Sequence, residues 1–253
     1  MTAVSDPVRI LVVQNDDDKH AGRIGRALED AGAELTIAMA YGAIPDVADF
    51  DGLLVLPGLG DPVDDEQAIH DARDAIVAAR GLDRPVLGVC LGGQLLAQSA
   101  GAEIYRSTPE LGIHPVRTTP AAQDDPLFRG IPAAYESFHA HAFAFRPVAD
   151  ATVLIESDAC CQAMRIGDRA WALQLHPEMT REGLHMLARA IDYDFEEGGI
   201  LPETAVFFRD AGVNPEQLHR QADELDELHT AIARQIGIGF ADACRSARAE
   251  RAV

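Results

Sequence analysis

Short apolar runs alternate with segments of helical periodicity in the first part of this chain. The runs cover residues 8–13, 51–57 and 85–89, and each is apolar at nearly consecutive positions. Between them, residues 20–31 and 64–81 place apolar side chains at helical spacing. A strand that is apolar on both faces needs helices above and below it. The pattern therefore predicts an α/β fold, with a mainly parallel open sheet and helices on both faces.

The same alternation includes a strand at residues 34–39 and a helix at residues 92–100, and then it changes. Between residues 102 and 172 the apolar pieces are short and separated by Pro and Gly. This composition predicts antiparallel strands and loops that extend over the carboxyl edge of the sheet. The candidate strands are residues 113–117, 142–146, 153–157 and 161–166.

A last buried strand at residues 170–175 and a helix at residues 180–194, with Thr180 as its N-cap, complete this unit. The composition then shifts. We therefore expect two units: residues 1–195 with the α/β fold, and residues 196–253 as a C-terminal helical extension.

The extension begins with a linker-like E-E-G-G at residues 196–199, and Asn214 followed by Pro is a strong helix start. One apolar stripe follows at helical spacing, formed by Leu218, Ala222, Leu225, His229, Ile232, Ile236 and Phe240. We expect this stripe to pack on the main unit or on a second copy of the chain, which makes it a candidate contact for a homo-oligomer. Gly237 and Gly239 are expected to weaken the end of the helix.

Composition excludes several classes of function. The 41 acidic and 21 basic residues give a formal charge of -20, which disfavours binding to a nucleic-acid phosphate backbone. No apolar run is long enough to cross a membrane, and the N-terminus lacks the pattern of a secretory signal. The four cysteines suit neither a disulfide framework nor a paired zinc site, so a reducing cytoplasm is the expected location.

The G-V-C-L-G-G-Q motif of residues 88–94 follows directly on an apolar run. A small residue two positions before a cysteine and a glycine two positions after it suit a sharp strand-to-helix turn. Such an elbow holds a nucleophile at the tip of a sheet. The motif therefore predicts that Cys90 attacks a carbonyl carbon.

A cysteine nucleophile needs a base and a group that orients the base. The candidates are His176 and Glu178, which would project to the same side at the end of an extended strand. An oxyanion hole could be formed by the backbone N–H of Leu91 and by a glycine-rich turn at residues 57–61. Loops after neighbouring parallel strands open on the same edge of a sheet, so these groups should meet there.

Three motifs together resemble the signature blocks of class I, triad-type glutamine amidotransferases. They are residues 56–60, 88–97 and 174–178, and the resemblance runs over residues 8–192. The segments 14–25 and 137–139 look closest to stand-alone members related to the amidotransferase domain of GMP synthetase. The resemblance implies a flavodoxin-like three-layer sandwich that hydrolyses the side-chain amide of L-glutamine.

The resemblance also implies a role for each matching residue. Cys90 would be the nucleophile, His176 the general base and acid, and Glu178 the orienting carboxylate. The N–H groups of Leu59 and Leu91 would form the oxyanion hole. The substrate would be held by Gly58, Gln94, Ser137, Phe138 and His139.

Leu59 stands where many members carry a second glycine, and a non-glycine residue is less free to reorient its peptide. The oxyanion hole is therefore expected to depend on a partner or acceptor.

Three functions remain open from the sequence. The first is a glutaminase that supplies ammonia to an acceptor synthetase on a separate chain. The second is a γ-glutamyl hydrolase or peptidase with the same triad, and the third is a weakly active regulatory or binding subunit. The intact set of Cys90, His176 and Glu178 disfavours the third function. The measurement that separates them is release of ammonia and glutamate from glutamine and from γ-glutamyl dipeptides.

No cofactor or metal is expected. Residues 16–18 with His20 are interpreted as a solvated loop, because three consecutive acids do not converge on one ion without a shaped turn. His139 and His141 share a face near the expected pocket and are interpreted as part of a substrate loop rather than as metal ligands. Cys160 and Cys161 are interpreted as packing residues of a strand.

Overall fold

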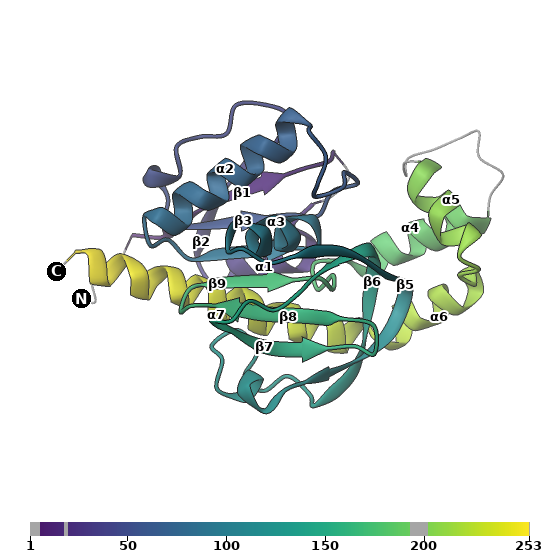
Figure 1. Cartoon of the computed structure of the whole chain (residues 1–253). Helices are drawn as coiled ribbons and strands as arrows, with labels where there is room; N and C mark the ends of the chain where they lie inside the picture. Colours follow the sequence, from purple (N-terminus) through teal and green to yellow (C-terminus); the bar gives the residue numbers. More distant parts are fainter. Residues whose placement is uncertain (1–5, 18–19, 193–201, 253) are drawn as a thin grey trace.

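The computed structural model describes residues 6–17, 20–192 and 202–252. One sheet of nine strands runs through these residues in the order β2-β1-β3-β4-β9-β8-β7-β5-β6 (Figure 1). The strands are β1 Val8–Gln14, β2 Ala33–Met39, β3 Gly52–Val55, β4 Val86–Val89, β5 Ile104–Thr118, β6 Ala134–Phe145, β7 Ala151–Glu156, β8 Cys161–Ile166 and β9 Ala170–Leu173. The helices are α1 Gly22–Asp30, α2 Gln67–Gly81, α3 Leu91–Ser99, α4 Arg181–Asp192, α5 Pro202–Asp210, α6 Pro215–Glu224 and α7 Asp226–Arg251, with short 3-10 turns at Val47–Asp49 and Pro120–Gln123.

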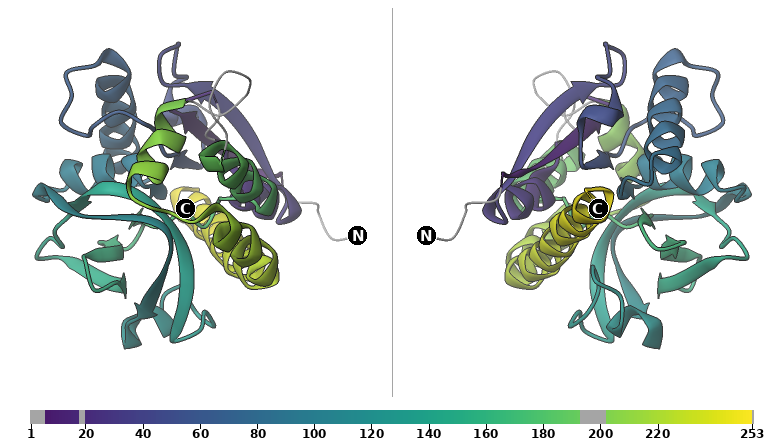
Figure 2. Two further views of the ribbon diagram at one scale, coloured as in Figure 1. Left: turned by 90° about the vertical axis from the view of Figure 1, so that its right-hand side faces the viewer. Right: turned by 90° about the vertical axis from the view of Figure 1, so that its left-hand side faces the viewer.

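The first five strands of this order are parallel, which confirms the predicted α/β class. Their side chains alternate between two cores, as strands buried on both faces require. Ile10 and Val12 of β1 join the core formed with α1 and α7, whereas Leu11 and Val13 join the core formed with α2 and α3. The protein therefore has three layers, with the sheet in the middle (Figure 2).

The strands β8, β7, β5 and β6 extend the sheet in antiparallel pairing beyond β9. The long β5 and β6 curve strongly (Figure 2). The sequence located only parts of these two strands, at residues 113–117 and 142–146. Pro109, Gly112 and Pro115 hide the strand pattern of β5, although Gly112 and Pro115 face His139 and Glu136 in the register with β6. β5 also has a bulge between Arg106 and Glu110.

The C-terminal helices depart from the predicted single stripe, because the chain turns at Leu225 and forms two helices. Leu218 and Ala222 of α6 pack against α4 and α5, whereas Ile232, Ile236 and Phe240 of α7 lie in the core with α1. Figure 1 shows α7 running along the sheet, with α4, α5 and α6 gathered at the end away from both termini. The stripe thus packs on the α/β unit of the same chain.

The expectation that Gly237 and Gly239 weaken α7 is wrong, because the helix continues to Arg251. These positions are places of close contact. A Cβ at Gly237 would lie 2.6 Å from Cβ of Ala27 in α1, and one at Gly239 would lie 2.4 Å from the carbonyl oxygen of Pro126. The glycines let α7 approach its neighbours, and this outweighs their low helix propensity.

Both predicted helix starts are confirmed. Thr180 Oγ1 accepts from the N–H of Gly183 at 3.0 Å, and Asn214 Oδ1 accepts from the N–H of Gln217 at 2.9 Å. The predicted linker at residues 196–199 and the boundary between residues 195 and 196 lie outside the described residues. Within the described residues, none of the helices combines the length and apolarity that crossing a bilayer requires.

Candidate active site

The predicted nucleophile elbow is present between β4 and α3. Cys90 has φ 50° and ψ -109°, a strained conformation for a residue with a side chain. Its flanking glycines are required by close approach: a Cβ at Gly88 would lie 2.3 Å from the carbonyl oxygen of Gly92, and one at Gly92 would lie 2.2 Å from that of Val55. The thiol is thereby presented at the carboxyl end of β4, at the start of a helix.

His176 and Glu178 form a pair in the loop after β9. Nδ1 of His176 lies 2.8 Å from Oε1 of Glu178, and both side chains are buried. The pair is as predicted, but the reason given for it is wrong. β9 ends at Leu173, so the pair lies in the irregular segment after the strand and only Glu178 is in a turn. The loop is held instead by the N–H of His176, which donates to the carbonyl oxygen of Phe138 at 3.0 Å.

The charge state of His176 follows from its neighbours. Burial lowers the pKa of the imidazole, but the Glu178 carboxylate and then the charge of Cys90 outweigh this and raise the pKa to about 10. Nε2 has no hydrogen-bond partner among the described residues and remains available for proton transfer. The site therefore favours an imidazolium at neutral pH, which is the partner that a cysteine thiolate requires.

Two backbone N–H groups were predicted to stabilise an oxyanion. That of Leu91 is the first of α3, a position whose N–H has no partner within the helix. That of Leu59 instead donates to Oδ2 of Asp16 at 2.7 Å. Asn15 fixes the same turn, because its Nδ2 donates to the carbonyl oxygen of Leu56 at 2.6 Å. The Leu59 N–H is thus bonded to a carboxylate from the loop after β1.

These groups line one cavity of about 1040 Å³ at the carboxyl ends of the parallel strands. Most of the predicted site residues lie around it, namely Gly58, Leu59, Cys90, Leu91, Gln94, Phe138, His176 and Glu178. Ser137 and His139 are buried and do not line it. Arg26 and Arg106 also line the cavity, and they are cations that could meet a carboxylate of the substrate.

Gln174 has a place in the site that sequence reasoning did not assign. Its Nε2 donates to Sγ of Cys90 at 3.7 Å, and its Oε1 accepts from Nε2 of Gln94 at 3.1 Å. Gln94 also donates to the carbonyl oxygen of Phe143 at 3.1 Å. The two amides therefore join α3, β6 and the loop after β9 beneath the sulfur. In the sequence, the role of these two glutamines is indicated by their positions, 94 and 174, which lie within the signature motifs.

Arg23 of α1 is a second residue that sequence reasoning missed. Its backbone N–H donates to the carbonyl oxygen of Glu178 at 2.9 Å, and its guanidinium donates to that of Met179. The same buried guanidinium pairs with Asp226 of α7 at 2.5 Å. The C-terminal helix is thereby connected to the loop that carries Glu178.

The comparisons with known proteins agree with this geometry. The family profile for glutamine amidotransferase class-I matches residues 13–192. The glutamine amidotransferase-like protein YfeJ of Salmonella typhimurium is 31% identical over 193 residues, which cover 71% of this chain and 80% of that protein. The imidazole glycerol phosphate synthase subunit HisH of Natronomonas pharaonis is 28% identical over 200 residues, with 68% and 89% covered.

Solved structures show the same fold. A glutamine amidotransferase from Thermotoga maritima superposes with a TM-score of 0.77 at 19% identity, over 90% of this chain and 96% of that one. A glutamine amidotransferase from Methylobacillus flagellatus gives a TM-score of 0.77 at 21% identity, over 94% and 95%. With the match of the family profile, the elbow and the buried His–Glu pair, this chain belongs to the class I glutamine amidotransferase family.

Proposed function

We propose that this protein hydrolyses the side-chain amide of L-glutamine through Cys90, His176 and Glu178. The observation that carries the proposal is the strained elbow of Cys90 beside a buried imidazole whose other nitrogen meets a carboxylate at 2.8 Å. This is the arrangement of nucleophile, base and orienting acid on which triad hydrolysis depends. Membership of the family supports it.

The chemistry follows from the positions of these groups. The Cys90 thiolate adds to the amide carbon, and the resulting oxyanion is stabilised by backbone N–H groups. The His176 imidazolium gives its proton to the amide nitrogen, the C–N bond breaks and ammonia leaves. Water then adds to the γ-glutamyl thioester while His176 takes its proton, and glutamate leaves as the thiolate is restored. Glu178 keeps Nδ1 protonated and stabilises the imidazolium throughout.

The hydrogen bond to the Asp16 carboxylate is evidence for a regulatory step that precedes this chemistry. The Leu59 N–H must leave Asp16 Oδ2, 2.7 Å away, before it can donate to an oxyanion. We infer that the free chain is held in a state of low activity and that a partner or acceptor displaces this bond. The relatives include the glutamine-hydrolysing GMP synthase component of Archaeoglobus fulgidus, 29% identical over 159 residues. An acceptor enzyme on a separate chain is therefore the proposed recipient of the ammonia.

The volume of the cavity supports a second candidate function. Pockets for drug-sized ligands span about 300–1000 Å³, and the cavity of about 1040 Å³ is large for free glutamine. Helix α5 adds Thr204, Phe207 and Phe208 to its wall. This room suits a γ-glutamyl amide with a bulky amine portion, which the same triad would hydrolyse.

One experiment separates the two candidates. The purified chain is incubated with glutamine and with γ-glutamyl dipeptides, and ammonia, free amine and glutamate are followed. Turnover of glutamine alone supports the first function, and turnover of dipeptides alone supports the second. Turnover of either substrate that persists in Cys90→Ala would show that the triad proposal is wrong.

The four free cysteines fit a reducing compartment, and we propose that the protein acts in the cytoplasm.

A further inference from the structure

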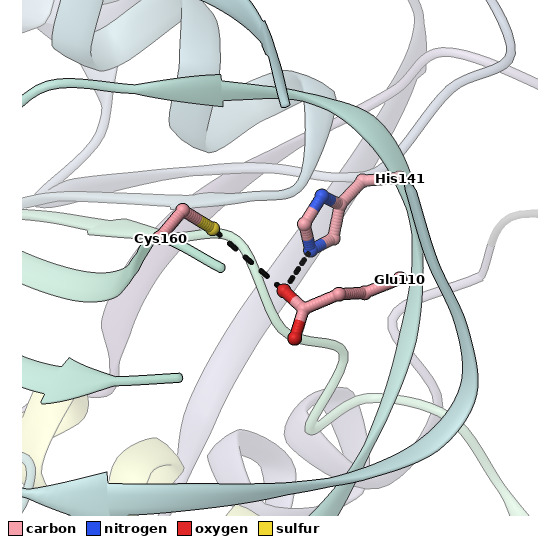
Figure 3. A group of neighbouring side chains, drawn as sticks. All are labelled: Glu110, His141 and Cys160. Atoms are coloured by element: carbon pink, nitrogen blue, oxygen red, sulfur yellow. Dashed lines mark hydrogen bonds and ion pairs between the residues drawn. The ribbon is translucent and has the colours of Figure 1, made fainter. Parts of the chain in front are cut away.

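A second cluster of buried polar side chains joins β5, β6 and the residue before β8 (Figure 3). Glu110, His141 and Cys160 point toward one another, and their donor atoms all lie within 4.8 Å. Oε2 of Glu110 is 3.3 Å from Nε2 of His141 and 3.8 Å from Sγ of Cys160. Nδ1 of His139 lies 3.8 Å from the same oxygen. A carboxylate, a thiol and two imidazoles thus converge on one point.

The imidazoles of this cluster are poorly satisfied. His139 is 0% exposed and His141 is 4% exposed, yet the contact of His141 Nε2 with Glu110 at 3.3 Å and that of His139 Nδ1 at 3.8 Å do not have hydrogen-bond geometry, and no other hydrogen-bond partner is found for these rings among the described residues. A buried ring whose nitrogens form no hydrogen bond of good geometry is costly and rare in native proteins.

The carboxylate of the cluster is also held by neutral donors. Glu110 is buried, and Ser157 Oγ and Gln162 Nε2 donate to its Oε2 at 3.0 Å and 2.6 Å. Within the described part of the chain, the titratable partners found within 4.0 Å of the Glu110 carboxylate are the imidazoles of His139 and His141. The buried carboxylate and the imidazole nitrogens beside it thus offer several donor atoms to a cation.

We propose that Glu110, His141 and Cys160, with His139 as the fourth donor within reach, bind a divalent transition-metal ion of the zinc class. Zinc bonds of about 2.0–2.2 Å to nitrogen and oxygen and about 2.3 Å to sulfur give tetrahedral edges of about 3.3–3.7 Å. The separation of 3.3 Å between Glu110 Oε2 and His141 Nε2 matches such an edge, whereas the 3.8 Å to Cys160 Sγ and to His139 Nδ1 would have to shorten on binding. A mixed sulfur, nitrogen and oxygen donor set favours zinc over magnesium or calcium.

The surrounding residues fit this assignment. Ser157 and Gln162 would orient the carboxylate from outside the ligand set, as outer-shell donors do in metal sites. A metal ion binds cysteine as the thiolate, so uptake of the ion would displace the proton of Cys160 and release acid.

The site would stiffen one wall of the active-site cavity. His141 lines that cavity, and the neighbouring carbonyl oxygen of Ala140 lies 3.9 Å from Sγ of Cys90. The ion would tie this part of β6 to β5 and to the residue before β8. The assignment differs from the sequence interpretation, which placed His139 and His141 in a substrate loop and Cys160 among the packing residues.

The test is metal binding to the full chain in a Cys90→Ala background, so that the catalytic thiol contributes no signal. The protein is stripped with a chelator and titrated with Co²⁺, and Zn²⁺ is counted by mass spectrometry after dialysis. We expect one ion per chain and a near-ultraviolet sulfur-to-cobalt charge-transfer band. Cys160→Ser should abolish the band and His141→Gln should lower the affinity at least tenfold, whereas the neighbouring Cys161→Ser should leave both unchanged.

Two controls keep the outcome decisive. His185 and His219 lie with their Nδ1 atoms 2.6 Å apart near the surface, and His219→Gln removes this pair as a source of adventitious binding. Circular dichroism checks that each variant folds, and Cys160→Ala replaces Cys160→Ser if the latter does not. Zn²⁺ should raise the Tm of the parent protein but not that of the Cys160 variant. Absence of stoichiometric binding, or a band that survives loss of Cys160, would overturn the proposal.

Discussion

The bond between the Leu59 N–H and Asp16 predicts that a substitution of Asp16 will raise the activity of the free chain. Asp16→Ala removes the acceptor, so the N–H no longer has to leave a carboxylate before it meets the oxyanion. A hydrogen bond to a charged group contributes about 1.5–3 kcal/mol. Leu59 is 42% exposed, which favours the lower end of that range. A decrease of about 1.5 kcal/mol in the activation free energy corresponds to about a tenfold rise in kcat/KM.

The assay is glutamate release by the isolated protein under initial-rate conditions. Asp17→Ala is the matched control, because it removes the same charge from the same loop and Asp17 accepts from the Tyr41 hydroxyl at 2.5 Å rather than from Leu59. Asp16→Asn should lie between Asp16→Ala and the parent, since a neutral amide oxygen accepts more weakly. Folded Asp16→Ala protein with unchanged or lower kcat/KM, or an equal rise in Asp17→Ala, would refute the reasoning.

Three further outcomes are expected. Glu178→Gln removes the charge that raises the pKa of His176 to about 10. We therefore expect kcat to fall by about 10²–10⁴-fold and the alkaline limb of the pH–rate profile to move to lower pH. An unchanged alkaline limb would contradict the claim that Glu178 sets the pKa of His176. Gly88→Ala places a Cβ 2.3 Å from the carbonyl oxygen of Gly92 and should lower the free energy of unfolding in urea by about 1–3 kcal/mol, whereas Gly81→Ala, with open space around its Cβ, should not destabilise the protein. Gln174→Leu should lower kcat with little change in KM, because Gln174 contacts the sulfur at 3.7 Å; a change in KM alone would show that Gln174 acts on substrate binding instead.

The parts of the site that the sequence predicted are those that depend on local spacing. The elbow at Cys90 follows from Gly88 and Gly92, because only a residue without a side chain fits the two backbone approaches there. His176 and Glu178 lie only two positions apart in the sequence, so a single turn of the loop is enough to bring their side chains together. Four of the five parallel strands, β1, β3, β4 and β9, were found because each is apolar on both faces, whereas β2 is an edge strand with exposed polar residues.

The parts that were missed depend on contacts between distant segments. The bond of Asp16 to Leu59 joins the loops after β1 and β3, and neither loop alone indicates it. The pair of Arg23 and Asp226 joins α1 to α7 across most of the chain. Gly237 signals a weak helix by propensity, yet its role is the close contact with Ala27. The sequence therefore predicts the catalytic groups better than the contacts that hold or restrain them.

The central claim is that Cys90 forms a covalent bond to the γ-carbonyl carbon of its substrate. Its most direct test is reaction of the full chain with 6-diazo-5-oxo-L-norleucine, a glutamine analogue that alkylates the nucleophile, followed by intact mass and peptide mapping. We predict a single adduct on Cys90, slowed by added glutamine, with Cys160, Cys161 and Cys244 unmodified. An adduct on another residue, or no adduct in a protein that still hydrolyses glutamine, would contradict the account.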